Sequence, residues 1–353
     1  MIVGVPRERK AGERRVALLP AAVGEITALG HDVHVETRAG SGVGHDDDAY
    51  RDARATIVTA RDAWDADLVV KVKEAQPEDF AIMPRGATIF SYHHLPGEPE
   101  RTRALADRGA SAIAFEMVRD ARGHFPLLAP MSEIAGRMAI GIGTRLAGRA
   151  PARVLVLGAG HAGLQAAREA RRAGAHVTVL TRSERSRDAA RAQGHEAALA
   201  TPAEVERAAL AADLVVGAVF VQGEPTPKLL PRALVARMRT GAVIVDVSID
   251  AGGVAETSRP TTHEAPTFVE EGVVHYCVAN IPAADPVAAA GAICAAALPY
   301  VIDMTEAGVA AALLANRELR AGVLLWQGRV NHAGIAAEAG LPYTPLTDAD
   351  LVE

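Results

Sequence analysis

The stretch Val154-Leu-Val-Leu-Gly158-Ala-Gly160-His-Ala-Gly163-Leu-Gln-Ala-Ala-Arg168 decides the fold. An apolar run typical of a buried parallel strand leads into three glycines and then into a helical pattern. In this G-x-G-x-x-G pattern, Gly158 forms the tight turn, Gly160 lets the backbone approach a pyrophosphate, and Gly163 lets the helix pack on its strand. Glycine-rich turns also occur as plain loops, but the strand and helix on either side favour a dinucleotide-binding turn.

The end of the next expected strand indicates which dinucleotide is bound. An acidic residue there would hydrogen-bond the ribose hydroxyls of NAD. This chain instead reads Thr181-Arg182-Ser183-Glu184-Arg185, and two guanidiniums with two hydroxyls suit a 2′-phosphate. We therefore expect NADP in preference to NAD. The alternative is a solvated helix start, with Glu184 contacting the ribose of NAD.

Composition indicates a soluble globular protein. The chain has 353 residues, of which 49% are hydrophobic and only 4% aromatic, enough for two domains with cores of alanine, valine and leucine. Its 37 basic and 43 acidic residues are well mixed, with a formal net charge of -6, which argues against a nucleic-acid-binding surface.

No segment is expected to direct the chain to a membrane or out of the cell. The first residues enter a strand at once, without a basic region followed by an apolar one. The most apolar segment, residues 287–304, is interrupted by Pro299 and favours a buried helix. Cys277 and Cys294 resemble neither a metal pair nor a disulfide framework. We expect a cytoplasmic protein without a metal site.

Short valine, isoleucine and leucine runs alternate with helical stretches in two series, which predict an α/β fold. The first series places strands at 2–5, 32–36, 67–72, 87–91 and 112–115, with a helix at 20–29. The second places a helix at 131–146 and strands at 153–157, 176–180, 213–219, 242–247 and 273–276. We expect two Rossmann-like domains with mostly parallel sheets and a cleft between them, where ligands meet the carboxyl ends of strands.

The domains are expected to be discontinuous in sequence. After Pro282 the chain turns helical, and the stretch that continues through residues 317–339 is too long for the second domain alone. We expect it to return and pack on the first. This predicts a catalytic, substrate-binding domain of residues 1–128 and 285–353, and a dinucleotide-binding domain of residues 129–284.

Several motifs in order resemble the alanine dehydrogenase and transhydrogenase alpha-subunit family, and most of all its alanine dehydrogenases. They are residues 4–10, 13–17, 70–74, 93–95, 129–137, 158–163, 245–253, 258–262 and 277–282. The resemblance implies an NAD(P)-dependent oxidoreductase that converts an L-amino acid, alanine or a related one, into a 2-oxo acid and ammonia, and catalyses the reverse reductive amination. It also implies a homo-oligomer, commonly a hexamer.

Arg15 is the candidate for binding a substrate carboxylate, because a guanidinium can donate two parallel N–H bonds. The resemblance implies the same role. The alternative is an ion pair with Glu8 or Glu13 at the surface. Arg14 is adjacent, and only one of the two arginines can face the site.

Lys73 ends an apolar strand, where a buried ammonium needs an anion. The resemblance implies that it holds and polarises the substrate carbonyl. Lys71, two residues earlier on the same face of the strand, is the rival candidate. An ion pair with Glu74 is the alternative explanation.

His94 follows the strand at 88–92 and is the candidate for acid/base catalysis, because the reference pKa of histidine lies near physiological pH. The resemblance implies the same role. His93 beside it is the alternative. His124, His161 and His195 have no comparable context and stay unassigned.

Asp250 lies beyond the strand at 242–247, before a Gly-Gly pair that allows close backbone approach. The resemblance implies that it assists proton transfer at the reacting carbon. Asp246 is the alternative, although from within the strand it is expected to cap a turn. The resemblance also implies that Asn280 and Ser132 lie near the nicotinamide and the phosphates, with Asn280 near the substrate as well.

Two segments depart from the family pattern. Residues 144–152 replace a longer glycine-rich loop of alanine dehydrogenases, and Pro96-Gly-Glu-Pro-Glu follows His94. Both could reshape the substrate site and leave the amino acid open. The alternatives are a transhydrogenase-like module that binds a dinucleotide and transfers hydride, or an imine reductase on the same scaffold.

Overall fold

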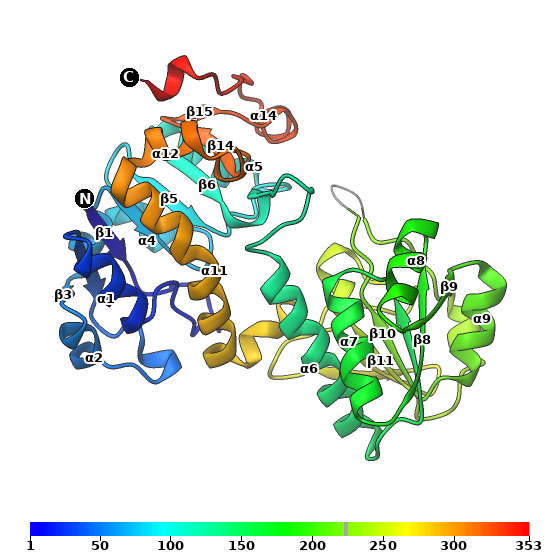
Figure 1. The fold of residues 1–353 in the computed structure, drawn as a ribbon. Coiled ribbons are helices and arrows are strands. Elements are labelled where there is room, and N and C mark those ends of the chain that lie inside the picture. The colour runs from blue at the N-terminus through cyan, green and yellow to red at the C-terminus, as the bar shows by residue number, and fades with distance from the viewer. Residues whose placement is uncertain (222–224, 353) are drawn as a thin grey trace. The chain divides into compact units, whose positions relative to one another are not determined.

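The computed structural model describes residues 1–221 and 225–352, which form two compact α/β units (Figure 1). One unit comprises Met1–Pro130 and Asp285–Glu353, and the other comprises Met131–Ala284. Each contains one mostly parallel sheet with helices packed on it. The expected fold class, two α/β domains with mostly parallel sheets, is therefore confirmed.

The first unit is built on an eight-stranded sheet in the order β15-β14-β6-β5-β4-β1-β2-β3. Its strands are β1 (Ile2–Val5), β2 (Asp32–Glu36), β3 (Thr56–Val58), β4 (Leu68–Val70), β5 (Thr88–Ser91), β6 (Ser111–Ala114), β14 (Val323–Trp326) and β15 (Arg329–Val330). The six strands β1 to β6 run parallel, whereas β14 is antiparallel to both β6 and β15. The strand order reverses between β1 and β4.

Nine α-helices belong to the described part of this unit. They are α1 (Pro20–Ala28), α2 (Asp47–Asp52), α3 (Ala60–Trp64), α4 (Pro77–Ile82), α5 (Pro99–Asp107), α11 (Pro286–Ala307), α12 (Val309–Ala315), α13 (Arg317–Arg320) and α14 (Ala333–Ala339). The chain does return to the first unit after Pro282, but residues 317–339 are not all helical. They add β14 and β15 to the edge of the sheet beside β6.

The second unit is built on a seven-stranded sheet in the order β12-β13-β11-β10-β7-β8-β9. Its strands are β7 (Arg153–Leu157), β8 (His176–Thr181), β9 (Glu196–Leu199), β10 (Leu214–Gly217), β11 (Val243–Asp246), β12 (Thr267–Glu270) and β13 (Val273–Tyr276). Its α-helices are α6 (Ala129–Ala147, which begins in the first unit), α7 (His161–Arg172), α8 (Glu184–Ala192), α9 (Pro202–Ala211) and α10 (Arg232–Val235). Only β12 is antiparallel to its neighbour, and the order reverses between β7 and β10.

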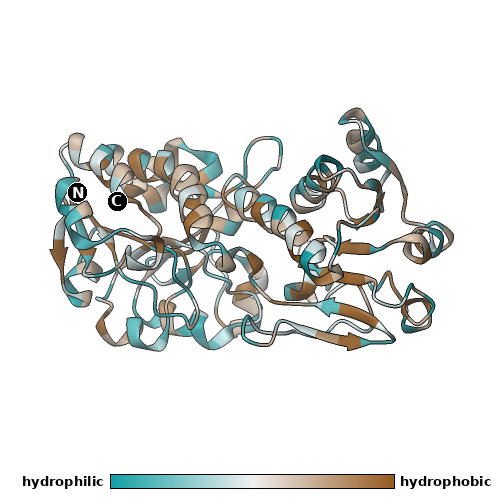
Figure 2. Ribbon diagram, turned by 90° about the horizontal axis from the view of Figure 1, so that it is seen from below, coloured by the Kyte–Doolittle hydropathy of each residue, from teal (hydrophilic) through white to brown (hydrophobic). Residues whose placement is uncertain are grey.

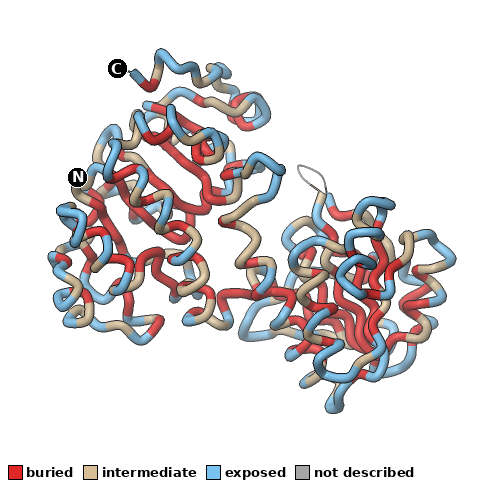
Figure 3. Tube along the Cα trace, viewed as in Figure 1, coloured by how far each residue is buried: buried red, intermediate tan, exposed pale blue. Residues whose placement is uncertain are grey.

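Strand β7 shows why the sheet is buried on both faces. Val154 and Val156 point into a core shared with α6 and α7, whereas Leu155 and Leu157 point into a second core with α9 and α10. Side chains alternate between the faces of a strand, so a continuous apolar run suits a strand that is covered on both sides. Figure 2 shows the strands as largely hydrophobic, and Figure 3 shows the same segments as buried.

Helix α11 is the one helix among the described residues that is long and apolar enough to cross a membrane, judged by length and composition alone. Inside the folded unit, 39% of its most apolar window is buried. One face, with Ile293, Ala297 and Val301, lies in the core, whereas Val287 is 62% exposed. Pro299 was expected to interrupt this segment, but the helix continues through it with Pro299 on the exposed face.

Candidate active site

In the first unit, polar side chains gather where the strand order reverses. The Glu8 carboxylate, after β1, accepts hydrogen bonds from the backbone N–H groups of Val72 at 2.7 Å and Lys73 at 3.3 Å, after β4. These bonds tie the two loops together at the carboxyl edge of the sheet, which is where open α/β sheets bind ligands. Burial raises the pKa of Glu8, and the nearby Lys71 ammonium opposes this rise.

Lys73 and His94 are brought together at this edge. Lys73 Nζ lies 3.2 Å from His94 Nε2, and the His94 ring stacks on Tyr92 with a centroid distance of 5.9 Å. Lys73 is 7% exposed, whereas His94 is exposed. A ligand can therefore reach the imidazole while the ammonium stays inside the protein.

The backbone at His94 is held in an uncommon conformation. His94 has a φ of 46°, in the left-handed region that costs free energy for a residue other than glycine. The Glu116 carboxylate accepts from the backbone N–H groups of His93, at 3.1 Å, and His94, at 2.7 Å. Glu116 therefore holds the turn that carries His94.

Electrostatics favour the uncharged form of His94 in the free protein. Desolvation by the surrounding protein, followed by the positive charge of Lys73, lowers the pKa of His94 to about 3. Desolvation also lowers the pKa of Lys73, and the charges of Arg15 and Lys10 add to this effect. The pKa of His94 therefore lies below the reference value of histidine, and the neutral imidazole that this favours can accept a proton.

Arg15 is 2% exposed and forms a two-pronged ion pair with Glu13. Its Nε donates to Oε1 of Glu13 at 2.7 Å and its Nη2 donates to Oε2 at 2.5 Å. The expected alternative, an ion pair with Glu13, is present, but it is buried and not at the surface. Arg14 is exposed, so Arg15 is the arginine that points inward.

Lys71 has other partners than Lys73. Its ammonium is fully buried, 3.5 Å from Glu8 and 3.4 Å from Asp79. Because β4 ends at Val70, the alternation of a strand does not extend to residue 73, and Lys71 and Lys73 have different surroundings. The expected partner Glu74 instead binds Lys10 at 2.5 Å.

In the second unit, the three glycines after β7 occupy different environments. Gly158 has a φ of 107°, and a Cβ there would lie 2.2 Å from the carbonyl oxygen of Ala218. A Cβ on Gly163 would lie 1.9 Å from the carbonyl oxygen of Gly158. By contrast, a Cβ on Gly160 would meet nothing within 4 Å, and Gly160 is the residue before helix α7. An open space therefore lies beside the first turn of this helix, as an incoming pyrophosphate requires.

The residues after β8 form the start of helix α8. Thr181 is buried, and Ser183 caps the helix by accepting from the backbone N–H of Ser186 at 3.2 Å. Arg182 and Arg185 are exposed, and no described residue forms an ion pair with either.

Asp250 lies in a 3₁₀ turn, Val247–Ala251, after β11 and is exposed. Its carboxylate accepts from the backbone N–H of Asn280 at 3.4 Å. Asp246 is fully buried and accepts from Ser248 N at 3.1 Å, so it caps the turn as expected. Ser132 is half-buried in the first turns of α6.

Two residues next to Lys73 and His94 in the first unit, Glu116 and Tyr92, were not predicted from the sequence. Glu116 lies two residues after β6, in a 3₁₀ turn (Phe115–Met117), and an acidic residue just beyond a fully buried strand was an available signal. Tyr92, which stacks on His94, directly follows β5. Among the described residues, no group of three or more His, Cys, Asp or Glu could hold a metal ion.

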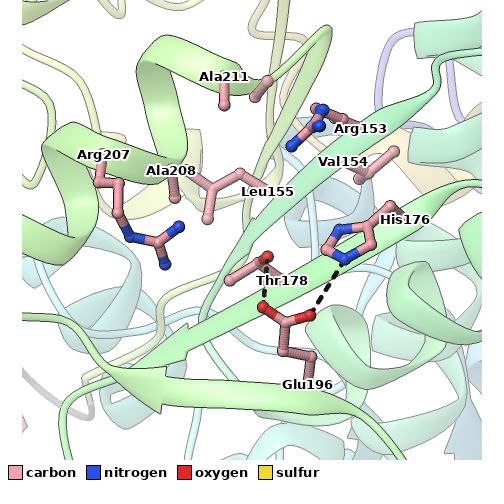
Figure 4. Close-up of a pocket in the computed structure, with 10 residues that line it drawn as sticks. Arg153, Val154, Leu155, His176, Thr178, Glu196, Arg207, Ala208 and Ala211 are labelled. Carbon is pink, nitrogen blue, oxygen red and sulfur yellow. Dashed lines mark hydrogen bonds and ion pairs between the residues drawn. The ribbon is translucent and has the colours of Figure 1, made fainter.

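A small cavity lies at the amino ends of the strands of the second sheet, where β7 and β8 begin (Figure 4). Glu196 bonds His176 at 3.2 Å and Thr178 at 3.4 Å beside it. The volume is about 50 Å³, which suits water molecules and not a dinucleotide.

Comparison with known proteins shows to which family the chain belongs. The family models described as alanine dehydrogenase/PNT, N-terminal domain and C-terminal domain match residues 4–135 and 130–333. The alanine dehydrogenase of Bacillus subtilis (strain 168) is 39% identical over 369 residues, covering 99% of this chain and 97% of that protein. The alanine dehydrogenase of Mycobacterium tuberculosis (strain H37Rv) is 41% identical over 364 residues, covering 98% of each.

Solved structures agree. An L-alanine dehydrogenase superposes with a TM-score of 0.91 and 38% identity, covering 96% of this chain and 98% of that one. A transhydrogenase from Sinorhizobium meliloti superposes with a TM-score of 0.83 and 26% identity, covering 94% and 99%. The chain belongs to the alanine dehydrogenase/PNT family, and it is a pyridine-nucleotide-dependent amino-acid dehydrogenase.

Proposed function

We propose that this protein interconverts L-alanine, or a closely related small L-amino acid, with its 2-oxo acid and ammonia. The observation that carries the proposal is the convergence of Arg15 and Lys73 beside His94 in the first unit. The Arg15 charge lowers the pKa of Lys73, and two such neighbouring cations form a site where a substrate carboxylate and carbonyl oxygen are stabilised. A neutral imidazole next to them supplies a base.

Each residue has a distinct task in this proposal. Arg15 holds the carboxylate, and Lys73 donates to the oxygen of the carbonyl. A nicotinamide, when bound, would provide the acceptor for the α hydrogen of the amino acid as hydride. His94 and Asp250 take protons from, and return them to, the nitrogen and the attacking water while the imine is hydrolysed to the 2-oxo acid and ammonia.

The second unit is proposed as the dinucleotide-binding domain, with boundaries near residues 129–284. The open space at Gly160 fits a pyrophosphate at the first turn of α7. Asn280 and Ser132 are proposed to orient the nicotinamide and phosphates. The remaining residues, 1–128 and 285–353, are proposed as the catalytic domain.

We also propose NADP as the preferred dinucleotide over NAD. Arg182 and Arg185 are exposed and have no described ion-pair partner, and the hydroxyls of Thr181 and Ser183 lie beside them in sequence. Charged hydrogen bonds from guanidiniums to a phosphate are stronger than neutral ones to a ribose hydroxyl. Glu184, the residue that would favour NAD, lies 3.8 Å from Arg187.

The family membership supports two further proposals. The first is a homo-oligomer, with a hexamer as the expected state, measured by analytical ultracentrifugation. The second is a cytoplasmic location. A transhydrogenase-like role is the alternative function, because the S. meliloti protein shares the fold closely.

The testing experiment is a panel of 2-oxo acids, each with ammonia and either NADPH or NADH, followed by cofactor oxidation. The proposal predicts turnover with pyruvate or a similar small acid, and loss of turnover in His94→Ala with cofactor affinity largely kept. His124→Ala, which alters an exposed histidine outside the cluster, is the matched control. Absence of turnover with every acid, or near-normal turnover in His94→Ala, would overturn the proposal, and hydride transfer between two dinucleotides alone would favour the transhydrogenase-like alternative.

A further inference from the structure

The chain uses lysine at very few positions. Only four of its 37 basic side chains are lysines. Three of them belong to the first unit. Lys10 contacts Glu74, Lys71 contacts Glu8 and Asp79, and Lys73 contacts His94. A lysine ammonium is a compact charge and an arginine guanidinium a planar fork, so the two are not interchangeable at a site of fixed geometry. The fourth lysine is Lys228, in the second unit.

Lys228 is surrounded by backbone carbonyl oxygens. Its Nζ donates to the carbonyls of Gly252, Gly253 at 3.0 Å and Ala255 at 3.1 Å. An ammonium has three N–H donors, so three carbonyls satisfy it. A planar guanidinium cannot direct its donors to three acceptors grouped in this way.

These carbonyls belong to the loop that directly follows Asp250. Gly252 and Gly253 both have left-handed backbones, with φ of 99° and 79°. Such a loop has high backbone entropy when free and needs external contacts to stay in one conformation. The Lys228 ammonium supplies those contacts on the carbonyl side of the loop.

Asp246 binds the same loop from its buried side. Its buried carboxylate accepts from Val254 N at 2.8 Å and Ser258 Oγ at 2.6 Å. Backbone bonds hold Lys228 in place as well, because Thr226 N donates to Ala251 O at 2.7 Å and Leu229 N donates to Val254 O at 2.8 Å. The loop is therefore held by a carboxylate that binds its N–H groups and by an ammonium that binds its C=O groups.

Asp250 depends on this loop for its position. Its carboxylate is exposed, and the hydrogen bond described for it, from Asn280 N, is long at 3.4 Å. The side chain itself is weakly held, so the backbone must place it. We infer that Lys228 is a positioning residue for the dehydrogenase reaction, which holds the loop after Asp250 so that this carboxylate can act in proton transfer; the inference rests on the role proposed for Asp250.

The first test is Lys228→Met, which keeps most of the stem and removes the ammonium. We expect kcat for alanine oxidation to fall at least about tenfold, because small misplacements of a catalytic group are costly. The dissociation constant of NADPH, followed by its fluorescence, is expected to change less than about threefold. Arg237→Ala, which removes a cation that pairs with exposed Glu206 at 2.6 Å, is the charge-matched control and is expected to keep wild-type kcat.

The second test separates positioning from general stabilisation. Lys228→Ala leaves the three carbonyls without their cation, and millimolar ethylammonium or propylammonium is expected to restore part of kcat. Lys228→Arg is expected to stay impaired because its guanidinium has the wrong shape. The assay runs in the deamination direction, so that the added amine does not compete with substrate ammonia, and thermal unfolding shows whether each variant is folded.

The inference is overturned by a kcat within about twofold of wild type in Lys228→Met. It is equally overturned if alkylammonium fails to rescue a folded Lys228→Ala, or if cofactor affinity falls as much as kcat. If Lys228→Met does not fold, a wild-type kcat in folded Lys228→Arg overturns it instead. Wild-type turnover in the same assay tests the proposed function separately, so the two failures are distinguishable.

Discussion

The Nζ atom of Lys73 lies 3.2 Å from Nε2 of His94, and the positive charge of Lys73 adds to desolvation in lowering the pKa of His94. A protonated lysine donates to an unprotonated imidazole nitrogen, so the ring proton of His94 must be on Nδ1. Two positive charges at this distance would repel, so the charge of Lys73 disfavours protonation of His94. A bound carboxylate offsets that repulsion and allows His94 to receive a proton during the reaction.

Removing the Lys73 charge is predicted to raise the pKa of His94. In Lys73→Met the pKa is expected to move up from about 3 while staying below 6.5, because desolvation, the largest cause of the depression, remains. The measurement is a pH titration of the His94 ring nitrogens by NMR. Lys10→Met removes a cation with a smaller effect on His94 and is expected to give a smaller rise. Titration of His94 near pH 6.5 in the wild-type protein would contradict this account.

Arg15→Lys is predicted to weaken binding of the 2-oxo acid. A lysine lacks the planar pair of donors and cannot form the two-pronged contact with Glu13 that orients the cation. We expect KM for the acid to rise about tenfold or more while the dissociation constant of the cofactor stays close to wild type. Arg14→Lys changes the exposed neighbour and is expected to leave KM unchanged; an equal rise in both variants would show that Arg15 has no special role.

Much of the fold could be predicted from the sequence because its signals are local. The bounds of β1, β2, β7 and β13 agree with the expected strands, since short runs of β-branched and aliphatic residues begin or end beside glycine, proline or acidic residues. Strands β3, β9, β12, β14 and β15 were missed. Strand β14 pairs antiparallel with β6, which is distant in sequence, and β15 pairs with β14 at the sheet edge. The pairing of β14 with β6 depends on the tertiary fold and not on local pattern.

The sequence allowed the residues of the candidate site to be proposed, but not their protonation states or ion pairs. Residues at the carboxyl ends of parallel strands converge, and the family resemblance then singled out Lys73 over Lys71 and His94 over His93. The protonation state of His94 could not be predicted, because it results from desolvation and from a cation that is far away in sequence. The ion pairs of Lys71 with Glu8 and Asp79 could not be predicted either, because the Glu8 partner is far away in sequence and both contacts depend on the fold.

Acid is predicted to destabilise the first unit through His93. His93 is 1% exposed, and desolvation lowers its pKa from 6.5 to about 4. A depressed histidine pKa means that the unfolded chain binds the proton first, so its stabilising contribution is present above pH 6.5 and is lost as the pH falls toward 4. The loss amounts to about 3 kcal/mol at full effect.

The measurement is urea unfolding between pH 7 and pH 4.5. His93→Gln is expected to show a shallower loss of the free energy of unfolding over this range than wild type. His124→Gln, at an exposed position, is expected to keep the wild-type slope, and the slope that remains in His93→Gln comes in part from His94, which shifts in the same direction. An unchanged slope in His93→Gln would refute the assignment.

Cofactor preference is predicted to depend on the two exposed arginines after β8. The double variant Arg182→Asp, Arg185→Ala replaces the proposed 2′-phosphate contacts with a carboxylate suited to ribose hydroxyls. We expect kcat/KM for NADPH to fall about a hundredfold while that for NADH rises or holds. Arg187→Ala, whose guanidinium bonds Asp188 at 2.8 Å, is the control and is expected to keep the wild-type preference. A wild-type preference for NADH would refute the NADP assignment directly.

The glycines after β7 are predicted to respond differently to one added methyl group. Gly163→Ala places a Cβ 1.9 Å from the carbonyl oxygen of Gly158, so the helix must move and the second unit is expected to lose stability. Gly160→Ala meets no protein atom within 4 Å, so the thermal midpoint is expected to stay near wild type. The same methyl group would occupy the space proposed for the pyrophosphate, and the dissociation constant of NADPH is expected to rise about tenfold or more. Tight NADPH binding by a stable Gly160→Ala would place the pyrophosphate elsewhere.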